Sequence, residues 1–498
     1  MTAVTDLHSG SRLSDLVRGV TGEARLPALT EQDIGRMRAS TEILAKALAG
    51  EQPVYGVTRG FGPLVAYAAA DDGEDQGAGL IAHLGTAQGE PLPPEVCRLV
   101  VWLRLNSMRQ GYSAVSPEFL NRLIDIWNGG FVPAIPRHGT VSASGDLQPL
   151  AHAALAHTGH GEAWTTGPDG AWTLRPAALA LAAAGAESVS WPAREALSFV
   201  NGTSVSLAMT ITNHVSLRRL VRVEAVLSAR MAGLLGANPE AYQEGIGRVR
   251  GQLGQLTVAR WIREDLPSGL SRDVSRPLQE PYSLRCVPQV LGAVLDQLAG
   301  LEEILLREAT GCTDNPICYE GEVLHGGNFH AMPVGLSSDQ LGLCLQQVAY
   351  LADRQLALLC DPAGNGGLPP MLTPRPGAGS GLAGVQLSAT SFVSRIRQLV
   401  YPASLTALPT NGGNQDHVPM ALNGANAVAE AAELAWLVAG SLAVGLTQYA
   451  HLTDRPADLT GLWGELAAVS PPLDRDRPLA GEVRAARDLL LSHAESLD

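Results

Sequence analysis

The tripeptide Ala143-Ser144-Gly145 could form a carbon electrophile from the backbone itself. If the chain bends tightly there, the amide nitrogen of Gly145 can reach the carbonyl carbon of Ala143, because glycine has no Cβ in the way and tolerates strained dihedral angles. Ring closure with loss of water, followed by loss of the Ser144 hydroxyl as a second water, gives an imidazolone with an exocyclic methylidene. Ordinary side chains supply nucleophiles, acids and bases, but no comparable electrophile.

The same residues have a simpler explanation, which is an ordinary loop that leads into a helix. Asp146 and the apolar pattern that follows it are typical of a helix N-terminus. An Ala-Ser-Gly tripeptide also arises by chance. The electrophile therefore needs support from other residues with suitable chemistry.

Three such side chains stand in suitable settings. Tyr55 lies in a loop with three glycines and a proline, and a phenol near a reaction centre can act as a base if its pKa falls from about 10 towards the working pH. Arg285 has apolar neighbours and needs an anionic partner, which could be a substrate carboxylate or a structural salt bridge. His83 lies on an apolar helix face, where it could be a packed side chain or a ligand-binding one.

The elements that must position these residues are helical. The chain is 46% hydrophobic but only 5% aromatic, so a core of Ala, Leu and Val in closely packed helices is expected. We predict a mainly α fold, with a long central helical bundle and a smaller N-terminal domain that carries the electrophile loop. The four longest helical patterns cover about residues 204–236, 288–310, 337–360 and 422–449.

The pattern divides the chain into three predicted parts: an N-terminal domain over 1–200, the long-helix bundle over 201–450 and a helical tail over 451–498. Thr30 should cap a helix that ends at Gly50. Shorter helices are expected within 94–128 and up to Val400. Three stretches are expected to lie outside regular structure: a polar arm over 1–25, a solvated turn at 71–75 and a surface excursion over 160–195.

Composition excludes several classes of function. A net charge of −14 argues against a nucleic-acid binder. No run of 18 apolar residues occurs, and the most apolar stretch, Leu434 to Leu446, is too short to cross a bilayer. The N-terminus has no signal-peptide pattern. Six cysteines without a CxxC pair indicate free thiols, rather than disulfides or a metal site, in a cytoplasmic protein.

Six motifs in order, within about residues 30–450, resemble the family of aromatic amino acid ammonia-lyases and aminomutases, which includes histidine, phenylalanine and tyrosine ammonia-lyases. The motifs are Tyr55-Gly56 through Phe61-Gly62, Ala143 to Leu147 with Pro149-Leu150-Ala151, Asn201-Gly202-Thr203, Pro281 to Cys286, Asp314-Asn315-Pro316, and Gly327-Asn328-Phe329-His330.

This resemblance implies a mechanism and an assembly. Ala143-Ser144-Gly145 would cyclise to 4-methylideneimidazol-5-one, so that neither an external cofactor nor a metal is needed, and the substrate amine would add to it. Tyr55 would take the β-proton, and Arg285 would hold the substrate carboxylate. The family assembles as a homotetramer whose active sites draw on several subunits.

The resemblance also implies a surrounding shell of side chains. Asn201 and the catalytic Tyr282 would lie against the ring, Gln279 and Asn328 would complete the polar shell, and Phe329 would lie near the aromatic group. No role in nucleic-acid or membrane binding is implied. The expected partner is a small aromatic amino acid.

Substrate choice depends on His83-Leu84 and Gln415. A His-Leu pair resembles tyrosine-acting members of the family, in which the imidazole hydrogen-bonds the phenol hydroxyl. Other segments, such as Ser283 to Gln289, are more similar to histidine lyases. However, those enzymes have an acid where this sequence has Gln415, so the charge that would face an imidazole is lost.

The leading interpretation is thus an ammonia-lyase that converts L-tyrosine to trans-4-coumarate. Alternatives are a tyrosine 2,3-aminomutase that gives β-tyrosine, a histidine or phenylalanine ammonia-lyase, and a scaffold that kept the fold without activity. The sequence departs from the family pattern at Thr58-Arg59, Gln76-Gly77 and Ser394-Arg395, which leaves an unusual substrate or mutase activity open.

Overall fold

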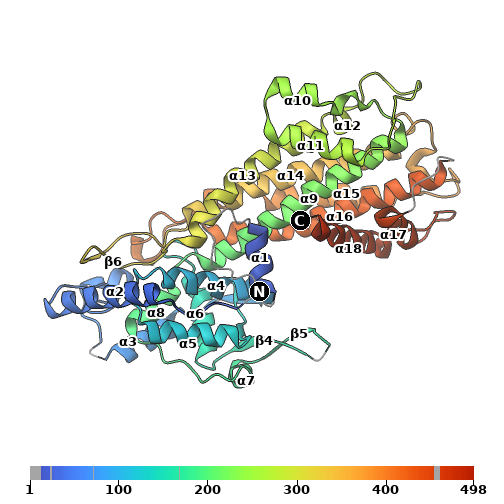
Figure 1. Cartoon of the computed structure of the whole chain (residues 1–498). Helices are drawn as coiled ribbons and strands as arrows, with labels where there is room; N and C mark the ends of the chain where they lie inside the picture. The colour runs from blue at the N-terminus through green and yellow to red at the C-terminus, as the bar shows by residue number, and fades with distance from the viewer. Residues whose placement is uncertain (1–12, 23–24, 71, 168, 454–459, 498) are drawn as a thin grey trace. The chain divides into compact units, whose positions relative to one another are not determined.

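The computed structural model describes residues 13–22, 25–70, 72–167, 169–453 and 460–497 (Figure 1). They form two compact units. Unit 1 comprises Met1–Thr212, Glu302–Asp339 and Pro402–Asn426, and unit 2 comprises Asn213–Leu301, Gln340–Tyr401 and Ala427–Asp498. The division into 1–200, 201–450 and 451–498 stays a prediction.

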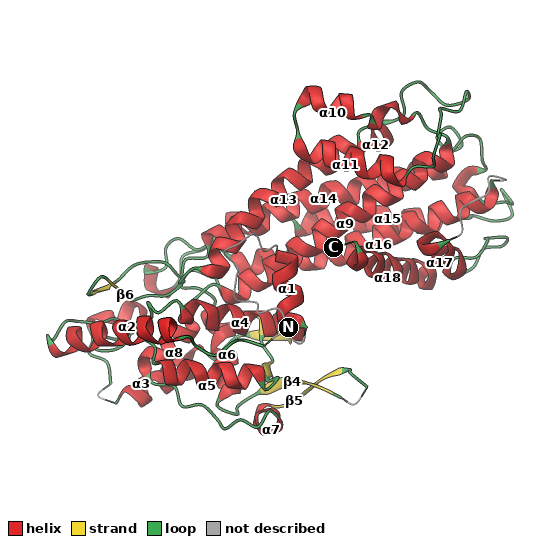
Figure 2. Cartoon of the chain, viewed as in Figure 1, coloured by secondary structure: helices red, strands yellow, loops and turns green. Residues whose placement is uncertain are grey.

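Helices make up most of the structure, which confirms the mainly α fold (Figure 2). The four long helices that the sequence predicts are present with nearly the expected ends: α9 (Ser204–Leu235), α13 (Val287–Thr310), α14 (Met332–Cys360) and α16 (Ala421–Leu452). Each contributes residues to both units. Their buried faces consist mainly of Leu, Val and Ala, and each fully buried Leu or Val contributes about 1.5–3 kcal/mol.

Unit 1 adds short helices and strands to these long helices. Its helices are α1 (Leu13–Thr21), α2 (Glu31–Ala49), α3 (Gly73–Leu84), α4 (Pro94–Arg109), α5 (Pro117–Asn128), α6 (Leu147–His157), α7 (Ala177–Ala183) and α8 (Ala193–Val200). Its strands are β1 (Gln88–Pro91), β2 (Val132–Pro133), β3 (Pro136–His138), β4 (Glu162–Thr166), β5 (Trp172–Pro176), β6 (Ile317–Tyr319) and β7 (Glu322–Leu324). They pair antiparallel as β1-β3, β2-β4-β5 and β6-β7.

Unit 2 contains α10 (Glu244–Arg250), α11 (Leu253–Asp265), α12 (Tyr282–Arg285), α15 (Ala383–Leu399), α17 (Gly461–Val469) and α18 (Ala480–Ser496). Close backbone approach is possible within it because glycines face each other. A Cβ on Gly254 of α11 would lie 2.1 Å from the carbonyl oxygen of Gly292 on α13. A larger residue at either position would force these two helices apart.

Helix α2 begins and ends where its local sequence predicts. Thr30 caps it, and the Thr30 hydroxyl and the Asp33 carboxylate exchange hydrogen bonds with each other's backbone N–H groups, as in a capping box. Gly50 follows the last helical residue, Ala49. Both predicted ends are confirmed.

Three predicted irregular stretches contain regular elements. The predicted arm is wrong for Leu13–Thr21, which forms α1 and buries Leu13, Leu16 and Val20. Spacings of three and four residues place these apolar side chains on one helix face. Residues 1–12 lie outside the described part of the chain.

The predicted turn at 71–75 is a helix start, because Asp72 caps α3, which begins at Gly73; Asp71 is outside the described residues. The predicted surface excursion over 160–195 contains the β4-β5 hairpin, α7 and the first residues of α8.

The prediction that no apolar stretch is long enough to cross a bilayer was also wrong. Helix α16 is long and apolar enough to cross a bilayer by length and composition alone. However, 67% of its most apolar window is buried inside the protein, which is the arrangement of a core helix. All six cysteines are free, as predicted.

Candidate active site

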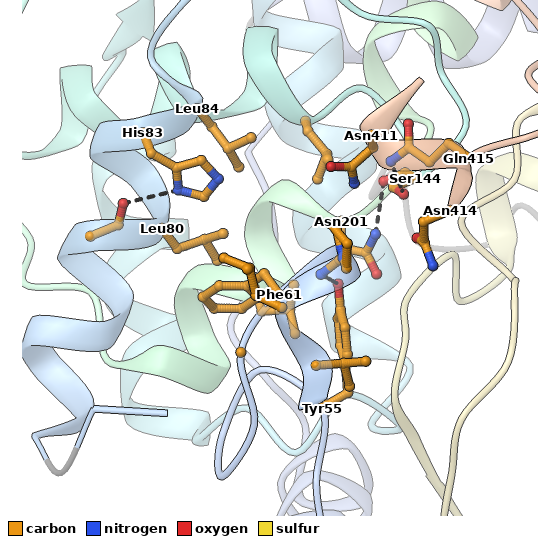
Figure 3. Close-up of a pocket in the computed structure, with 18 of the residues that line it drawn as sticks. Tyr55, Phe61, Leu80, His83, Leu84, Ser144, Asn201, Asn411, Asn414 and Gln415 are labelled. Carbon is orange, nitrogen blue, oxygen red and sulfur yellow. Dashed lines mark hydrogen bonds between the residues drawn. The ribbon is translucent and has the colours of Figure 1, made fainter. Parts of the chain in front are cut away.

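A cavity in unit 1 gathers many of the residues to which the sequence assigns chemistry (Figure 3). Its volume is about 970 Å³, at the upper end of the range for pockets that bind small ligands. Its walls come from the tyrosine loop (residues 54–69), helix α3, the bend at Ser144, the end of α8, and loops near 315, 329 and 410–415. Segments far apart in sequence therefore meet here.

The bend at Ala143-Ser144-Gly145 is as tight as the chemistry requires. Gly145 has φ +71°, and a Cβ there would lie 2.3 Å from the carbonyl oxygen of Gly202. Only glycine fits such a position. The N–H of Asp146 donates to the same Gly202 oxygen at 2.8 Å, and the Thr140 hydroxyl donates to the carbonyl oxygen of Gly145 at 3.3 Å. The chain is thus compressed at the residues that would have to close the ring.

Asp146 fixes this bend to the start of helix α9. Its Oδ1 accepts a hydrogen bond from the Ser142 hydroxyl, and its Oδ2 accepts one from the N–H of Ser206, each at 2.7 Å. Burial raises the pKa of Asp146, and these hydrogen bonds act in the opposite direction. Helix α6 begins at Leu147, directly after it, as predicted.

Two side-chain amides hold Ser144 in the cavity wall. Nδ2 of Asn201 donates to the Ser144 carbonyl oxygen at 2.7 Å, and Nε2 of Gln415 donates to the Ser144 hydroxyl at 2.9 Å (Figure 3). Oδ1 of Asn201 is buried and has no hydrogen-bond partner among the described residues. A buried acceptor without a partner is costly, so this oxygen is suited to accept an N–H from a ligand.

Tyr55 also lines the cavity, and its hydroxyl accepts a hydrogen bond from the N–H of Gly62 at 2.8 Å. Burial raises the pKa of the Tyr55 phenol, and the Gly62 N–H only partly offsets this. The fall in pKa that a phenol base requires is therefore not produced by the described residues of unit 1 taken by themselves. No Lys or Arg side chain is among the described residues that line the cavity, so the charge needed to favour a phenolate is not provided there.

His83 lies in the cavity wall on α3 with a defined tautomer. Its Nδ1 is 3.1 Å from the carbonyl oxygen of Gly79. Since a carbonyl oxygen only accepts, Nδ1 is the donor in this bond, and Nε2, which has no hydrogen-bond partner among the described residues, is the ring nitrogen left for a ligand. Leu80, Leu84 and Phe61 form apolar wall beside it (Figure 3).

The structure brings together only some of the predicted site residues. Those that line the cavity are Tyr55, His83, Leu84, Ser144, Asn201, Phe329 and Gln415, and Ala143 and Gly145 flank Ser144. Asn328 is exposed and does not line it. Gln279, Tyr282 and Arg285 belong to unit 2 and do not line it either.

Arg285 has no acidic partner within the described chain. Its guanidinium lies 4.8 Å from the ring centroid of Tyr282, and its Nε is buried without a hydrogen-bond partner. A structural salt bridge, one of the two explanations considered for this residue, is not formed with any described carboxylate. Tyr282 itself is 71% exposed. Both side chains are therefore available to a group from outside this chain.

Sequence reasoning missed several cavity residues. Asn411 and Asn414 line the cavity beside Gln415, and the density of amides in this loop was a usable signal. Gln76, noted as a departure, lines it as well. The other departures lie elsewhere: Arg395 pairs with Glu430 at 2.9 Å, with both side chains about half exposed, and Arg59 does not line the cavity. Among the described residues, no cluster of His, Cys, Asp or Glu could hold a metal ion.

Comparison with known proteins finds similarity to one family of enzymes. The family model described as aromatic amino acid lyase matches residues 12–487. A histidine ammonia-lyase of Aromatoleum aromaticum is 35% identical over 461 residues, which cover 91% of this chain and 86% of that protein.

Solved structures resemble the whole chain. Histidine ammonia-lyase from Trypanosoma cruzi has a TM-score of 0.84 at 28% identity, covering 96% of this chain and 92% of that one. Tyrosine aminomutase from Streptomyces globisporus has a TM-score of 0.89 at 28% identity, covering 98% and 96%.

Proposed function

Because the chain belongs to the aromatic amino acid lyase family, whose members act on the carbon–nitrogen bond of aromatic amino acids, we propose that it eliminates ammonia from L-tyrosine to give trans-4-coumarate. The observation that carries the choice of tyrosine is the tautomer of His83. Its Nε2 is an acceptor in the cavity wall, and a phenol hydroxyl is a donor.

The neutral side chain of Gln415 beside Ser144 favours tyrosine over histidine as the substrate. Gln415 supplies a neutral amide, which already donates to the Ser144 hydroxyl, so it offers no charge to a substrate imidazole. Phenylalanine would leave Nε2 of His83 without a donor, and a site built to bind a hydroxyl rejects the analogue that lacks it. The relation to a histidine ammonia-lyase at 35% identity keeps histidine as a competing substrate in the test.

We propose that Ala143-Ser144-Gly145 forms the 4-methylideneimidazol-5-one group. The ring would supply the carbon electrophile that the substrate's amino group needs. The residues present fit it: Gly145 has the required positive φ, Thr140 holds the Gly145 carbonyl, and Asn201 binds the Ser144 carbonyl oxygen, which the ring would retain. Gln415 binds the Ser144 hydroxyl, which is the group that would leave as water. The unpartnered Oδ1 of Asn201 would accept an N–H of the bound substrate.

Tyr55 is proposed to take the β-proton of the substrate. Burial raises its pKa, so proton transfer requires a cation that unit 1 does not place in the cavity wall. Arg285 has no carboxylate partner among the described residues of its own chain. We therefore propose that Arg285 and Tyr282 of a second copy complete the cavity, and that the enzyme is a homotetramer with shared sites.

A tyrosine 2,3-aminomutase is the second candidate. It is favoured by the TM-score of 0.89 to the Streptomyces globisporus tyrosine aminomutase. Both reactions would use the same cavity, and they differ in whether the arylacrylate stays bound until ammonia returns. We further propose a cytoplasmic location, supported by six free cysteines.

A substrate screen tests the proposal. Purified protein is incubated separately with L-tyrosine, L-phenylalanine and L-histidine, while acrylate absorbance and β-amino acid formation are followed. We expect 4-coumarate as the main product, with Ser144→Ala lowering turnover by several orders of magnitude in a folded protein. Predominant β-tyrosine would establish the aminomutase, predominant urocanate or cinnamate would overturn tyrosine, and normal turnover by Ser144→Ala would remove the ring.

A further inference from the structure

The backbone of the candidate base is held by a histidine far away in the sequence. The N–H of Tyr55 donates to Nε2 of His325 at 3.1 Å, across 270 positions of chain. Because a backbone N–H only donates, Nε2 of His325 must be unprotonated for this bond to form. His325 does not line the cavity, so it reaches the reaction only through Tyr55.

This hydrogen bond connects the tyrosine loop to another segment of unit 1. Every other hydrogen bond that the structure gives to residues 54–62 has its partner within the loop itself. Gly62 bonds the Tyr55 hydroxyl, Val54 exchanges bonds with Thr58, and Gly60 bonds the carbonyl of Tyr67. Within the described residues, hydrogen bonds thus order residues 54–62 internally, and the one from Tyr55 to His325 joins them to a residue outside the loop.

His325 itself stands on a rigid support. It follows strand β7 of the β6-β7 hairpin, and the N–H of the next residue, Gly326, donates to Oδ1 of Asn315 at 2.7 Å. The neighbouring Asp314 is buried and pairs with Arg194 of α8. Arg194 also donates to the carbonyl oxygen of Pro316 at 3.0 Å, so the residues directly before β6 are fixed to α8, and the Gly326 bond to Asn315 ties the other end of the hairpin to them.

We infer that His325 is a positioning residue for Tyr55, and that it holds the loop in its productive place only while the imidazole is neutral. This inference rests on the proposed function. Protonation would turn Nε2 into a second donor facing the Tyr55 N–H, so the tie would break in acid. A displacement of about 1 Å of a catalytic group can cost about 100-fold in rate.

The charges around His325 keep it neutral at ordinary pH. Burial and the Arg194 guanidinium lower the pKa of His325 below its ordinary value of 6.5. Arg194 faces it from α8, its partner Asp314 lies at the base of the hairpin, and the phenol of Tyr55 belongs to the loop that it holds. Release of the loop is thus expected only below pH 6.5.

The first test measures the hydrogen bond without any substrate. Amide exchange of the Tyr55 segment is followed by mass spectrometry in the intact oligomer, and each rate is divided by the intrinsic rate at that pH. We expect His325→Ala to lower the protection of the Tyr55 amide about fivefold at pH 8. His325→Gln offers an acceptor that does not titrate, so its protection should match the wild type at pH 8 and stay constant to pH 5.5.

The second test uses kinetics. With the substrate identified by the screen, His325→Ala should lower kcat about tenfold while KM changes less than about twofold, because the residue acts through a catalytic group. His325→Gln should restore kcat and lack the acidic fall in kcat that the wild type shows below pH 6.5. His160→Gln is the matched control and should keep the wild-type profile, since His160 is exposed and its ring bonds Thr158 among the described residues.

The outcomes separate the two proposals. If no aromatic amino acid is turned over, the proposed function fails, while the exchange data still decide the role of His325. Unchanged Tyr55 protection in His325→Ala, or an acidic fall in kcat that persists unaltered in His325→Gln, overturns the inference. Should His325→Ala fail to fold, the pH dependence of His325→Gln decides alone.

Discussion

Asn201 donates its side-chain N–H to the carbonyl oxygen of Ser144 at 2.7 Å and buries its own side-chain oxygen without a partner. One end of the amide thus binds the bend at Ser144, and the other has no hydrogen-bond partner among the described residues. Replacing Asn201 with Ala should lower kcat/KM by about 100-fold or more, because a preorganised polar contact at the reacting centre is lost.

The control for this change is Asn128→Ala, since Asn128 bonds the backbone of Leu26 and does not line the cavity. Steady-state kinetics of both variants would check the expectation. Similar activity losses in the two variants would show that the amide of Asn201 has no special role.

His83 should set the preference for a hydroxylated ring. His83→Phe removes the acceptor at Nε2, so the ratio of kcat/KM for tyrosine to that for phenylalanine should fall by about 10- to 100-fold. The measurement is the same ratio in the wild type and the variant. A ratio that does not move would place His83 outside substrate contact.

A shared active site can be tested by complementation. Tyr55→Phe and Arg285→Ala should each lower turnover strongly, because each removes one side chain of the proposed composite site. Mixed oligomers, made by co-expression or refolding together, would then contain sites with both native residues. With random assembly, roughly a quarter of the sites should be intact.

Activity of the mixed oligomers should therefore exceed the sum of the two separate variants. Size measurements would establish that assembly is equal in all samples. No recovery in properly mixed oligomers would mean that Tyr55 and Arg285 serve a site within one chain, or do not meet at all.

Glu224 should make the protein less stable as the pH rises. It is fully buried on helix α9, neither carboxylate oxygen has a hydrogen-bond partner among the described residues, and burial raises its pKa well above the ordinary value of 4.5. A pKa raised in the folded state favours the protonated form, so stability is greatest below the unfolded pKa and is lost as the pH rises towards the folded one.

Glu224→Gln removes this titration and should flatten the fall of the melting temperature between pH 5 and pH 8. Glu224→Leu should in addition raise the melting temperature at pH 8, by about 2 °C or more. Glu433→Gln, an exposed position on α16, serves as the control. Parallel melting curves for the wild type and Glu224→Gln across this range would contradict the expectation.

Local chemistry explains what the sequence could predict. The capping pair Thr30 and Asp33 predicted the start of α2, Gly50 predicted its end, and sustained helical patterns predicted the four long helices. Helix α1 was missed because Leu13–Thr21 is only 9 residues long, so its apolar pattern repeats over few turns. The bend at Gly145 was predictable because the reaction it permits requires glycine at that position.

Long-range geometry explains what the sequence could not predict. The pKa of Tyr55 depends on how deeply the phenol is buried, which no local pattern encodes. The free acceptor of His83 depends on a bond to Gly79 one helical turn before it, and the contact of Tyr55 with His325 joins segments 270 positions apart. For Arg285 the sequence left a substrate carboxylate and a structural salt bridge equally open, and only the structure shows that no described carboxylate pairs with it.

The close approach of Gly145 to Gly202 carries a consequence for how the enzyme matures. The two backbones meet only when the first turn of α9 has docked against the bend, where Gly202 and Ser206 accept and donate the bonds of Asp146. On the proposal that Ala143-Ser144-Gly145 forms the ring, a newly made chain would hold the tripeptide in unreacted form until unit 1 has folded. Full-length protein that folds late or incompletely would then accumulate as an intact polypeptide in which Ala143-Ser144-Gly145 has not cyclised.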